Sequence, residues 1–242
     1  MNKLEYKLDF TRQDEKTGNI PVIVLAAGSS TRMNGISKQF INLCGIPAIV
    51  HTLSAFEKAS EISRIVLVTK EDYIAEMQLL AQKFMITKLT DIVSGGDSRQ
   101  ESVKNGLEKI NEDYVLIHDG ARPLISEEVI SRVCSQLTSA DGVVCAVPVK
   151  DTIKKVDENG YIVNTVSRND LFSAQTPQGV RTEKYREILN SADCSCFTDD
   201  ASLLESAGLS VKIVAGDYRN IKITTQEDIT AAEGYLEKRG NE

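Results

Sequence analysis

Hydrophobic positions along the chain form short continuous runs that alternate with stretches of helical spacing. Val22–Leu25 is apolar and mostly β-branched at successive positions, which is typical of a strand buried on both faces. Similar runs occur at 65–68, 114–117 and 143–147, and helical spacing or capping signals predict helices at 48–58, 72–84, 98–110 and 126–137. This alternation predicts an α/β fold with a mostly parallel sheet and helices on both faces, whose ligands lie beyond the carboxyl ends of the strands.

The pattern changes between Lys150 and Val166, where alternating residues flank the pair Asn159-Gly160 and predict a β-hairpin. Because an isolated two-stranded ribbon is marginally stable, we expect this arm, about 150–168, to mediate dimerisation. Further elements are predicted at 182–189, at 199–207 with Thr198 as the cap, at 211–214, and after Thr225 and Asp228. Residues 1–20 lack periodicity and are predicted to be a mobile N-terminal extension, which leaves one domain at 21–242.

The first strand leads directly into small residues and then into two cations. Ala26, Ala27 and Gly28 allow a ligand to approach the backbone, whose amides suit phosphate oxygens, and Arg32 and Lys38 follow. The P-loop pattern fails because position 33 is Met, and the dinucleotide pattern fails because position 30 is Ser. The stretch resembles the L-A-A-G-x-x-x-R-M … K-Q signature of sugar-phosphate nucleotidyltransferases; the alternative is an ordinary strand–helix turn with solvated cations.

Composition narrows the class of protein. A net charge of −7 and a pI near 5.1 argue against nucleic-acid binding, so polyanions should be bound in a local cationic cleft, with a divalent metal. No apolar run approaches the roughly 20 residues of a membrane span. The five scattered cysteines are interpreted as thiols in a reducing compartment, and we expect a cytoplasmic protein.

Further motifs follow in order: GGDSRQESV, HDGARP, KDTIK, SRNDLFSAQTPQG, FTDDASL and NIKIT. Together with LAAGSSTRM and KQF, they resemble the 2-C-methyl-D-erythritol 4-phosphate cytidylyltransferase family over about residues 21–236. The resemblance implies a Rossmann-like fold, a homodimer that exchanges β-arms, a Mg²⁺ cofactor, and CTP and a polyol phosphate as substrates. The chemistry is attack of a substrate phosphate oxygen on the α-phosphorus of CTP, which calls for charge neutralisation and alignment.

The resemblance also implies roles for individual residues. Arg32 and Lys38 match the basic pair at the reacting phosphorus, and Asp119 matches the carboxylate that binds Mg²⁺. The implied nucleotide contacts are Ala26, Ala27, Gly28, Gly96, Asp97, Ser102, Asp119, Gly120 and Arg122. The implied polyol phosphate contacts are Thr152, Arg168, Thr176 and Lys222. Arg168 and Lys222 are also implied in catalysis, and Arg168 is implied to reach the neighbouring subunit's site.

Two other functions stay open. A ribitol- or other polyol-phosphate cytidylyltransferase would share the fold, the nucleotide and most of the cations, although LAAGSSTRM and AQTPQG favour methylerythritol phosphate. The second alternative is an inactive nucleotide-binding homologue. The presence of all four charged residues argues against it: Arg32, Lys38, Asp119 and Lys222. The chain also departs from the family pattern: Gly120 replaces the usual Ala and is expected to loosen its turn, Asp200 replaces Glu, and Asp217 is a candidate second metal ligand.

Overall fold

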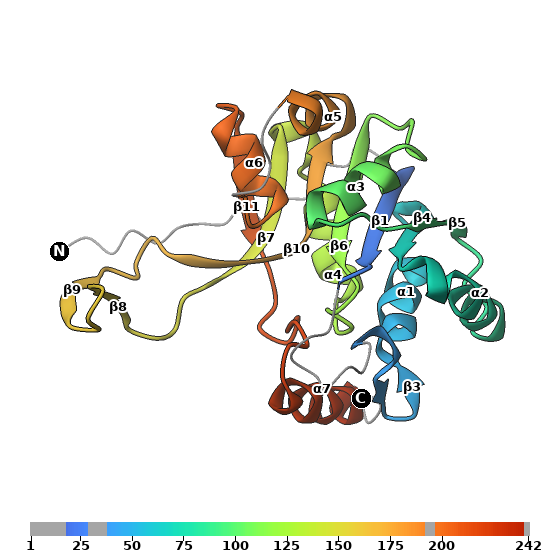
Figure 1. Cartoon of the computed structure of the whole chain (residues 1–242), viewed down its shortest axis with the longest axis horizontal. Helices are drawn as coiled ribbons and strands as arrows, with labels where there is room; N and C mark the ends of the chain where they lie inside the picture. The colour runs from blue at the N-terminus through green and yellow to red at the C-terminus, as the bar shows by residue number, and fades with distance from the viewer. Residues whose placement is uncertain (1–17, 29–37, 192–196, 240–242) are drawn as a thin grey trace.

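A seven-stranded sheet forms the centre of the molecule (Figure 1). The computed structural model describes residues 18–28, 38–191 and 197–239. The strands lie side by side in the order β11 (Val211–Ala215), β7 (Gly142–Pro148), β10 (Phe172–Arg181), β6 (Tyr114–Asp119), β1 (Ile20–Ala26), β4 (Ile62–Thr69) and β5 (Leu89–Ser94). β10 runs antiparallel to its neighbours β6 and β7, and the other pairs in the sheet are parallel. The predicted α/β fold with a mostly parallel sheet is confirmed.

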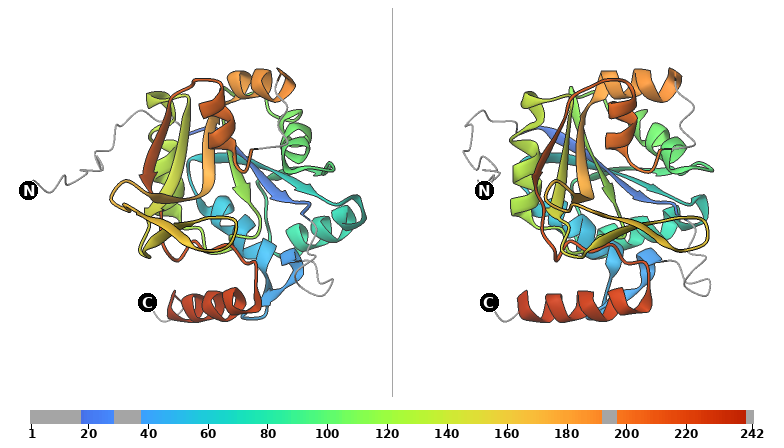
Figure 2. Two further views of the ribbon diagram at one scale, coloured as in Figure 1. Left: turned by 60° about the vertical axis from the view of Figure 1, so that its left-hand side comes forward. Right: turned by 90° about the vertical axis from the view of Figure 1, so that its left-hand side faces the viewer.

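Helices cover both faces of the sheet (Figure 2). On one face α1 (Ala48–Lys58), α2 (Ile74–Lys83) and α4 (Glu127–Cys134) share a core cluster with Val22 and Val24. On the other face α3 (Arg99–Leu107), α5 (Thr182–Ser191) and α6 (Asp200–Ser206) share a second cluster with Ile23. Alternate residues of β1 therefore enter opposite cores, as a strand buried on both faces requires.

A smaller apolar cluster lies apart from these two layers. It packs α7 (Gln226–Arg239) against β2 (Asn42–Leu43), which pairs with β3 (Ile46–Pro47), and its buried members include Leu43, Ile223 and Ile229. In both views of Figure 2, α7 lies below the sheet. Short 3₁₀ helices, η1 (Lys38–Phe40), η2 (Glu71–Tyr73) and η3 (Leu137–Ser139), complete the described elements. None of the helices in the described ranges has the length and apolar character that a membrane span needs.

Polar side chains set several helix starts as the sequence predicts. The Ser98 hydroxyl accepts the amide of Glu101 at 3.0 Å at the start of α3, while the Glu101 carboxylate accepts the amide of Asp97 at 2.8 Å. The predicted cap of α6 is wrong by one residue. Asp199, and not Thr198, accepts the amide of Ser202 at 3.0 Å, because a carboxylate directly before the helix reaches that amide.

The predicted hairpin is present as a two-stranded ribbon of β8 (Ile153–Val156) and β9 (Ile162–Val166), which extends away from the sheet (Figure 1). Gly160 has φ +84°, the left-handed conformation expected of a glycine in this turn. Several large apolar side chains of the hairpin are exposed, and Tyr161, Ile162 and Val163 are each more than half exposed. Its role in dimerisation stays a prediction.

The strand β10 was not predicted. Its segment Gln175–Gln178 is polar around Pro177, yet Gln175, Thr176 and Gln178 are all buried in the centre of the sheet. Each has specific polar partners, for example the Gln175 amide group, which donates to the carbonyl of Asp217 at 2.8 Å. Hydrogen bonds from distant parts of the chain allow these polar side chains to be buried, so β10 lacks the apolar pattern that identifies the other strands.

Candidate active site

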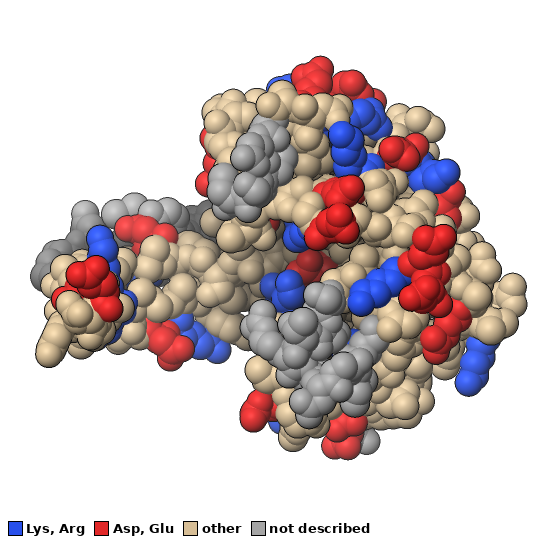
Figure 3. Space-filling model, in the orientation of Figure 1, with Lys and Arg blue, Asp and Glu red and all other residues tan. Residues whose placement is uncertain are grey.

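A pocket of about 570 Å³ opens at the carboxyl ends of β1, β4 and β6. The chain passes from β1 outward to β4 and β5 and then returns to β6 on the other side of β1, so the loops after β1 and β6 diverge at this point. In the space-filling view of Figure 3, basic and acidic side chains lie close together around the middle of the face that is shown. The predicted residues that line the pocket are Ala26, Ala27, Gly28, Lys38, Gly96, Asp97, Ser102, Asp119, Gly120 and Lys222.

The loop before α3 forms a close-packed wall of the pocket. A Cβ atom at Gly95 would lie 2.3 Å from Ala27 Cβ and 3.0 Å from Ser102 Oγ, so only glycine fits against the strand end. The Ser102 hydroxyl accepts the amide of Gly96 at 3.1 Å and donates to the carbonyl of Ser98 at 2.9 Å. This wall is therefore preorganised, with small residues where a flat ring could lie against the backbone. Gly95 is a residue that the sequence analysis missed.

Asp119, at the end of β6, lies among three cations. Its Oδ2 atom is 2.8 Å from Lys222 Nζ and 3.8 Å from Arg122 Nε, and its Oδ1 atom is 3.8 Å from Arg99 Nε. Burial alone would raise the pKa of Asp119, but Lys222, Arg99 and Arg122 together lower it to about 2. The carboxylate is therefore charged at neutral pH and is available to a hard cation.

A buried hydrogen-bond chain fixes the backbone beneath Asp119. The Thr176 hydroxyl accepts the amide of Asp119 at 3.0 Å and lies 3.1 Å from His118 Nδ1, while His118 Nε2 lies 3.2 Å from the carbonyl of Arg122. Because a carbonyl only accepts, Nε2 carries the proton and Nδ1 accepts from Thr176. Burial lowers the pKa of His118 to about 4, so the ring is neutral at pH 7. Thr176 thus supports Asp119 from below, and it is only 4% exposed.

The turn that contains Gly120 is tight, contrary to the expectation that glycine would loosen it. The Gly120 amide donates to the carbonyl of Leu25 at 2.8 Å, and its own carbonyl accepts the Thr52 hydroxyl at 3.1 Å. A Cβ at Gly120 would lie 2.9 Å from the Leu25 oxygen. The absence of a side chain therefore brings the loops after β1 and β6 close together.

The two described lysines of the predicted site come from segments joined by the α7 cluster. Lys38 Nζ donates to the carbonyl of Ile223 at 3.3 Å, and the amide of Ile223 donates to the carbonyl of Ala121 at 2.8 Å. These bonds link η1, the Lys222 segment and the loop that follows Asp119. Arg122 has a more structural position, because its terminal nitrogen donates to the carbonyl of Asn220 at 2.8 Å.

Two of the predicted substrate-binding residues lie outside the pocket. Thr152 and Arg168 are exposed at the base of the arm, where Arg168 donates to the carbonyl of Lys150, and neither lines the pocket. Arg32 falls outside the described residues. Asp217, the candidate second metal ligand, pairs with Arg219 at 2.8 Å and also does not line the pocket.

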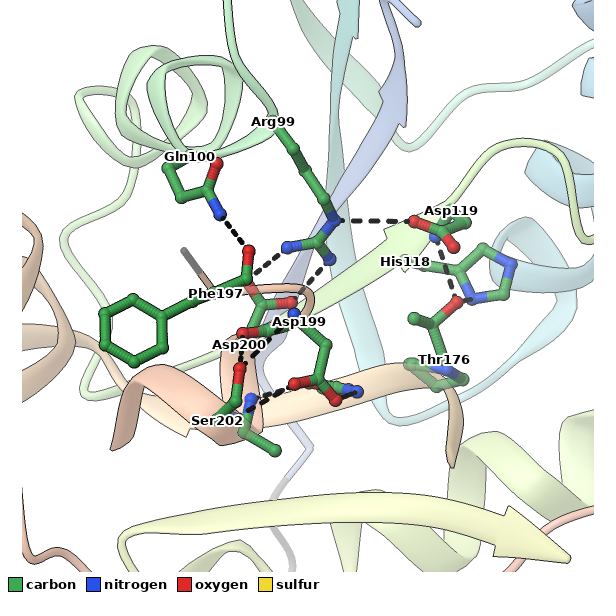
Figure 4. Close-up of polar contacts among 12 residues, drawn as sticks. Arg99, Gln100, His118, Asp119, Thr176, Phe197, Asp199, Asp200 and Ser202 are labelled. Atoms are coloured by element: carbon green, nitrogen blue, oxygen red, sulfur yellow. Dashed lines mark hydrogen bonds and ion pairs between the residues drawn. The ribbon is translucent and has the colours of Figure 1, made fainter. Parts of the chain in front are cut away.

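Sequence reasoning missed further residues at the site, namely Gln39, Lys70 and Arg99, which all line the pocket. Arg99 forms a two-pronged ion pair with Asp200, at 2.8 and 2.6 Å (Figure 4). The motifs around Arg99 and Asp200 were both recognised, but the two residues are 101 positions apart. Only the replacement of Glu by Asp at position 200 hinted that this position mattered.

The donors suit a metal that arrives with a nucleotide. The described part of the chain has no group of three or more His, Cys, Asp or Glu residues that could hold a metal ion. Asp119 offers a charged carboxylate in the pocket, and Mg²⁺ is commonly held by one or two carboxylates plus substrate phosphates. The described residues therefore suit a divalent cation that is also bound by phosphates of a ligand, and they form no metal cage of their own.

Comparisons with known proteins agree with this geometry. The family model of 2-C-methyl-D-erythritol 4-phosphate cytidylyltransferase matches residues 20–238. The chain is 44% identical over 219 residues to the 2-C-methyl-D-erythritol 4-phosphate cytidylyltransferase of Bacillus mycoides, covering 89% of this chain and 96% of the relative. It is 44% identical over 230 residues to that of Alkaliphilus metalliredigens, covering 91% and 94%.

A solved structure gives the same result. The crystal structure of 4-diphosphocytidyl-2C-methyl-D-erythritol synthase from Anaerococcus prevotii superposes with a TM-score of 0.81 at 32% identity, covering 91% of this chain and 97% of that one. Both the sequence and the fold thus match over nearly their whole length. The chain therefore belongs to the 2-C-methyl-D-erythritol 4-phosphate cytidylyltransferase family and is an enzyme of the nucleotidyltransferase class.

Proposed function

We propose that the pocket around Asp119 transfers the cytidylyl group of CTP to 2-C-methyl-D-erythritol 4-phosphate, which yields 4-diphosphocytidyl-2-C-methyl-D-erythritol and pyrophosphate. The observation that carries this proposal is the convergence of separate motifs on one pocket. Ala27, Ser102, Asp119 and Lys222 come from four distant parts of the chain, and all line it. The combination of a close-packed wall, a charged carboxylate and several cations suits a nucleotide whose α-phosphorus is attacked by a second phosphate.

The nucleotide lies between the loops after β1 and β6 in this proposal. The cytosine ring packs on Ala26 and Ala27 beside the wall formed by Gly96 and Ser102. Asp97, next to this wall, reads the polar edge of the ring, and the amides after β1, including that of Gly28, face the phosphates. Internal hydrogen bonds and close packing fix the shape of the wall, so little ordering is needed when the nucleotide binds.

The reaction itself needs alignment and positive charge. An oxygen of the polyol phosphate forms a bond to the α-phosphorus, the bond from that phosphorus to the bridging oxygen of the β-phosphate breaks, and pyrophosphate leaves with the electron pair. Lys38 and Arg32 stabilise the charge on the five-coordinate phosphorus, and Lys222 neutralises the entering phosphate. Asp119 would hold Mg²⁺, which would supply charge neutralisation at the triphosphate. Arg122 supports the Asp119 turn through Asn220 and borders the nucleotide side.

The polyol phosphate side is completed by a second copy of the chain in this proposal. Thr152, just before β8, and Arg168, just after β9, then face the partner's pocket, to which Thr176 contributes through Asp119. The exposed Tyr161, Ile162 and Val163 would be covered in such a homodimer. A cytoplasmic location is retained in the proposal because the five scattered cysteines of the sequence are interpreted as thiols in a reducing compartment.

The test is pyrophosphate release with CTP and Mg²⁺, measured in parallel with methylerythritol 4-phosphate and with ribitol 5-phosphate at equal concentrations. A strong preference for methylerythritol phosphate is expected. Preference for ribitol phosphate would keep the mechanism and replace the substrate. Tight CTP binding without pyrophosphate release from any polyol phosphate would indicate an inactive homologue. The mass in solution, measured by light scattering, tests the homodimer, and a monomer at assay concentrations would contradict it.

A further inference from the structure

A chain of polar contacts connects α5 and α6 to Asp119 through Arg99, the first residue of α3, and Figure 4 shows its part from Asp200 to Asp119. The Tyr185 hydroxyl donates to Asp200 Oδ1 at 2.5 Å. Asp200 also accepts from both terminal nitrogens of Arg99, at 2.8 and 2.6 Å. Arg99 Nε in turn lies 3.8 Å from Asp119 Oδ1. The guanidinium therefore stands between one carboxylate behind the pocket and another within it.

Burial makes the Arg99–Asp200 pair a fixed part of the structure. The Asp200 side chain is 0% exposed and that of Arg99 is 24% exposed. A carboxylate removed from water in this way needs a cation and hydrogen-bond donors close to it, which Arg99 and Tyr185 supply. Because both terminal nitrogens of Arg99 are bound to Asp200, the two-pronged edge with which arginine usually grips a phosphate is already occupied.

The same part of α3 is tied to the segment before α6 by a second contact. The side-chain amide of Gln100 donates to the carbonyl of Phe197 at 2.8 Å (Figure 4). Together with the Arg99–Asp200 pair, this contact holds the first turn of α3, which carries Ser102 of the pocket wall. The wall and the carboxylate of Asp119 are thus positioned relative to each other by groups outside the proposed contacts with substrate.

We propose that Arg99 and Asp200 are a positioning pair for Asp119, in which Asp200 balances the charge of Arg99 so that the Asp119 carboxylate stays available to the complex of Mg²⁺ and nucleotide. This inference rests on the proposed metal-binding role of Asp119. With a neutral residue at position 200, the guanidinium of Arg99 would be drawn toward Asp119 and would compete with Mg²⁺ for it. With Asp200 charged, the guanidinium stays bound to Asp200 and remains 3.8 Å from the Asp119 carboxylate.

The experiment measures CTP binding by calorimetry with and without Mg²⁺, in the absence of polyol phosphate, for the wild-type chain, Asp200→Asn and Arg99→Lys. Asp200→Asn keeps the shape and removes the balancing charge. Arg99→Lys keeps the charge but cannot form the two-pronged pair. The matched control is Glu112→Gln, which breaks another two-pronged pair, with Arg64 at 2.8 and 2.9 Å, near the amino-terminal ends of β4 and β6.

In both test variants the gain in CTP affinity produced by Mg²⁺ should fall by about tenfold, because a unit charge near 4 Å has at least that effect at the dielectric of a protein surface. The affinity for CTP without Mg²⁺ should stay within a few fold of wild type in both test variants. For Glu112→Gln, the CTP affinities with and without Mg²⁺ should both stay within that range. The inference is overturned if every test variant that folds keeps the wild-type Mg²⁺ gain, or if Glu112→Gln loses as much. A wild-type chain without any Mg²⁺ gain would instead refute the metal role of Asp119 itself. If Asp200→Asn does not fold, Arg99→Lys, whose side chain is partly exposed, decides.

Discussion

Replacement of Lys222 by alanine tests the proposed site most directly. Lys222 Nζ lies 2.8 Å from Asp119, but its side chain is 46% exposed, so it can turn toward an entering phosphate without rearrangement of the fold. A unit charge about 4 Å from another contributes about 4 kcal/mol at an effective dielectric near 20. Solvent screening of a half-exposed group reduces this to about 2 kcal/mol, which corresponds to about a thirtyfold change in rate.

The assay is the initial rate of pyrophosphate release at saturating CTP and Mg²⁺ over a range of methylerythritol phosphate concentrations. We expect kcat/KM for the polyol phosphate to fall about thirtyfold in Lys222→Ala, while the KM for CTP changes little. Lys184→Ala is the matched control, since Lys184 is 45% exposed and pairs at 2.6 Å with Asp141, which directly precedes β7. If the two variants have the same kcat/KM, Lys222 does not act on the substrate phosphate.

Three further predictions concern the same pocket. Arg32→Ala or Lys38→Ala should lower kcat by roughly 10²–10³ with an unchanged circular dichroism spectrum, as expected for loss of a transition-state donor, and near-normal turnover in both would remove them from the mechanism. Arg168→Ala should mainly raise the KM for the polyol phosphate in steady-state assays; a rise in the KM for CTP alone would mean that the two substrate sides are exchanged. The pKa of Asp119, lowered from 3.8 to about 2, makes the folded state more stable above pH 4, and this contribution is lost as the pH falls through both values. Urea unfolding at pH 5 and pH 3 should therefore show wild type losing about 1 kcal/mol more than Asp119→Asn, and equal losses would contradict the ion cluster.

The sequence predicts those parts of the fold in which side-chain pattern and local geometry agree. β1 was found because its apolar residues enter two cores, and α3 because the Ser98 cap is a local signal. β10 was missed because its buried Gln175 and Gln178 are stabilised by partners from β11's following loop and the start of α6, which no local pattern reveals. Long-range polar partners are invisible to periodicity.

In the candidate site, too, residues within local motifs could be predicted, whereas roles that depend on long-range packing could not. Residues within recognised motifs, such as Ser102, Asp119 and Lys222, do line one pocket. Thr176 was assigned to substrate, but its hydroxyl binds the amide of Asp119, a contact that depends on the antiparallel placement of β10. Arg99 was overlooked because a surface arginine and a buried one look alike in sequence, and burial depends on how α6 packs.

The small apolar cluster under α7 forms a region of the enzyme that can unfold separately from the central sheet. Lys38 and Lys222 both belong to segments that pack on this helix, whereas the central sheet is built from other, larger cores. Regions with few buried contacts open more readily than the global unfolding of a protein, in cooperative units of their own. Detachment of α7 would then release both lysines from the pocket while the sheet and its hydrogen bonds persist. Heating should therefore abolish turnover before the molecule as a whole denatures, so that the lifetime of activity reports the anchoring of the C-terminal helix.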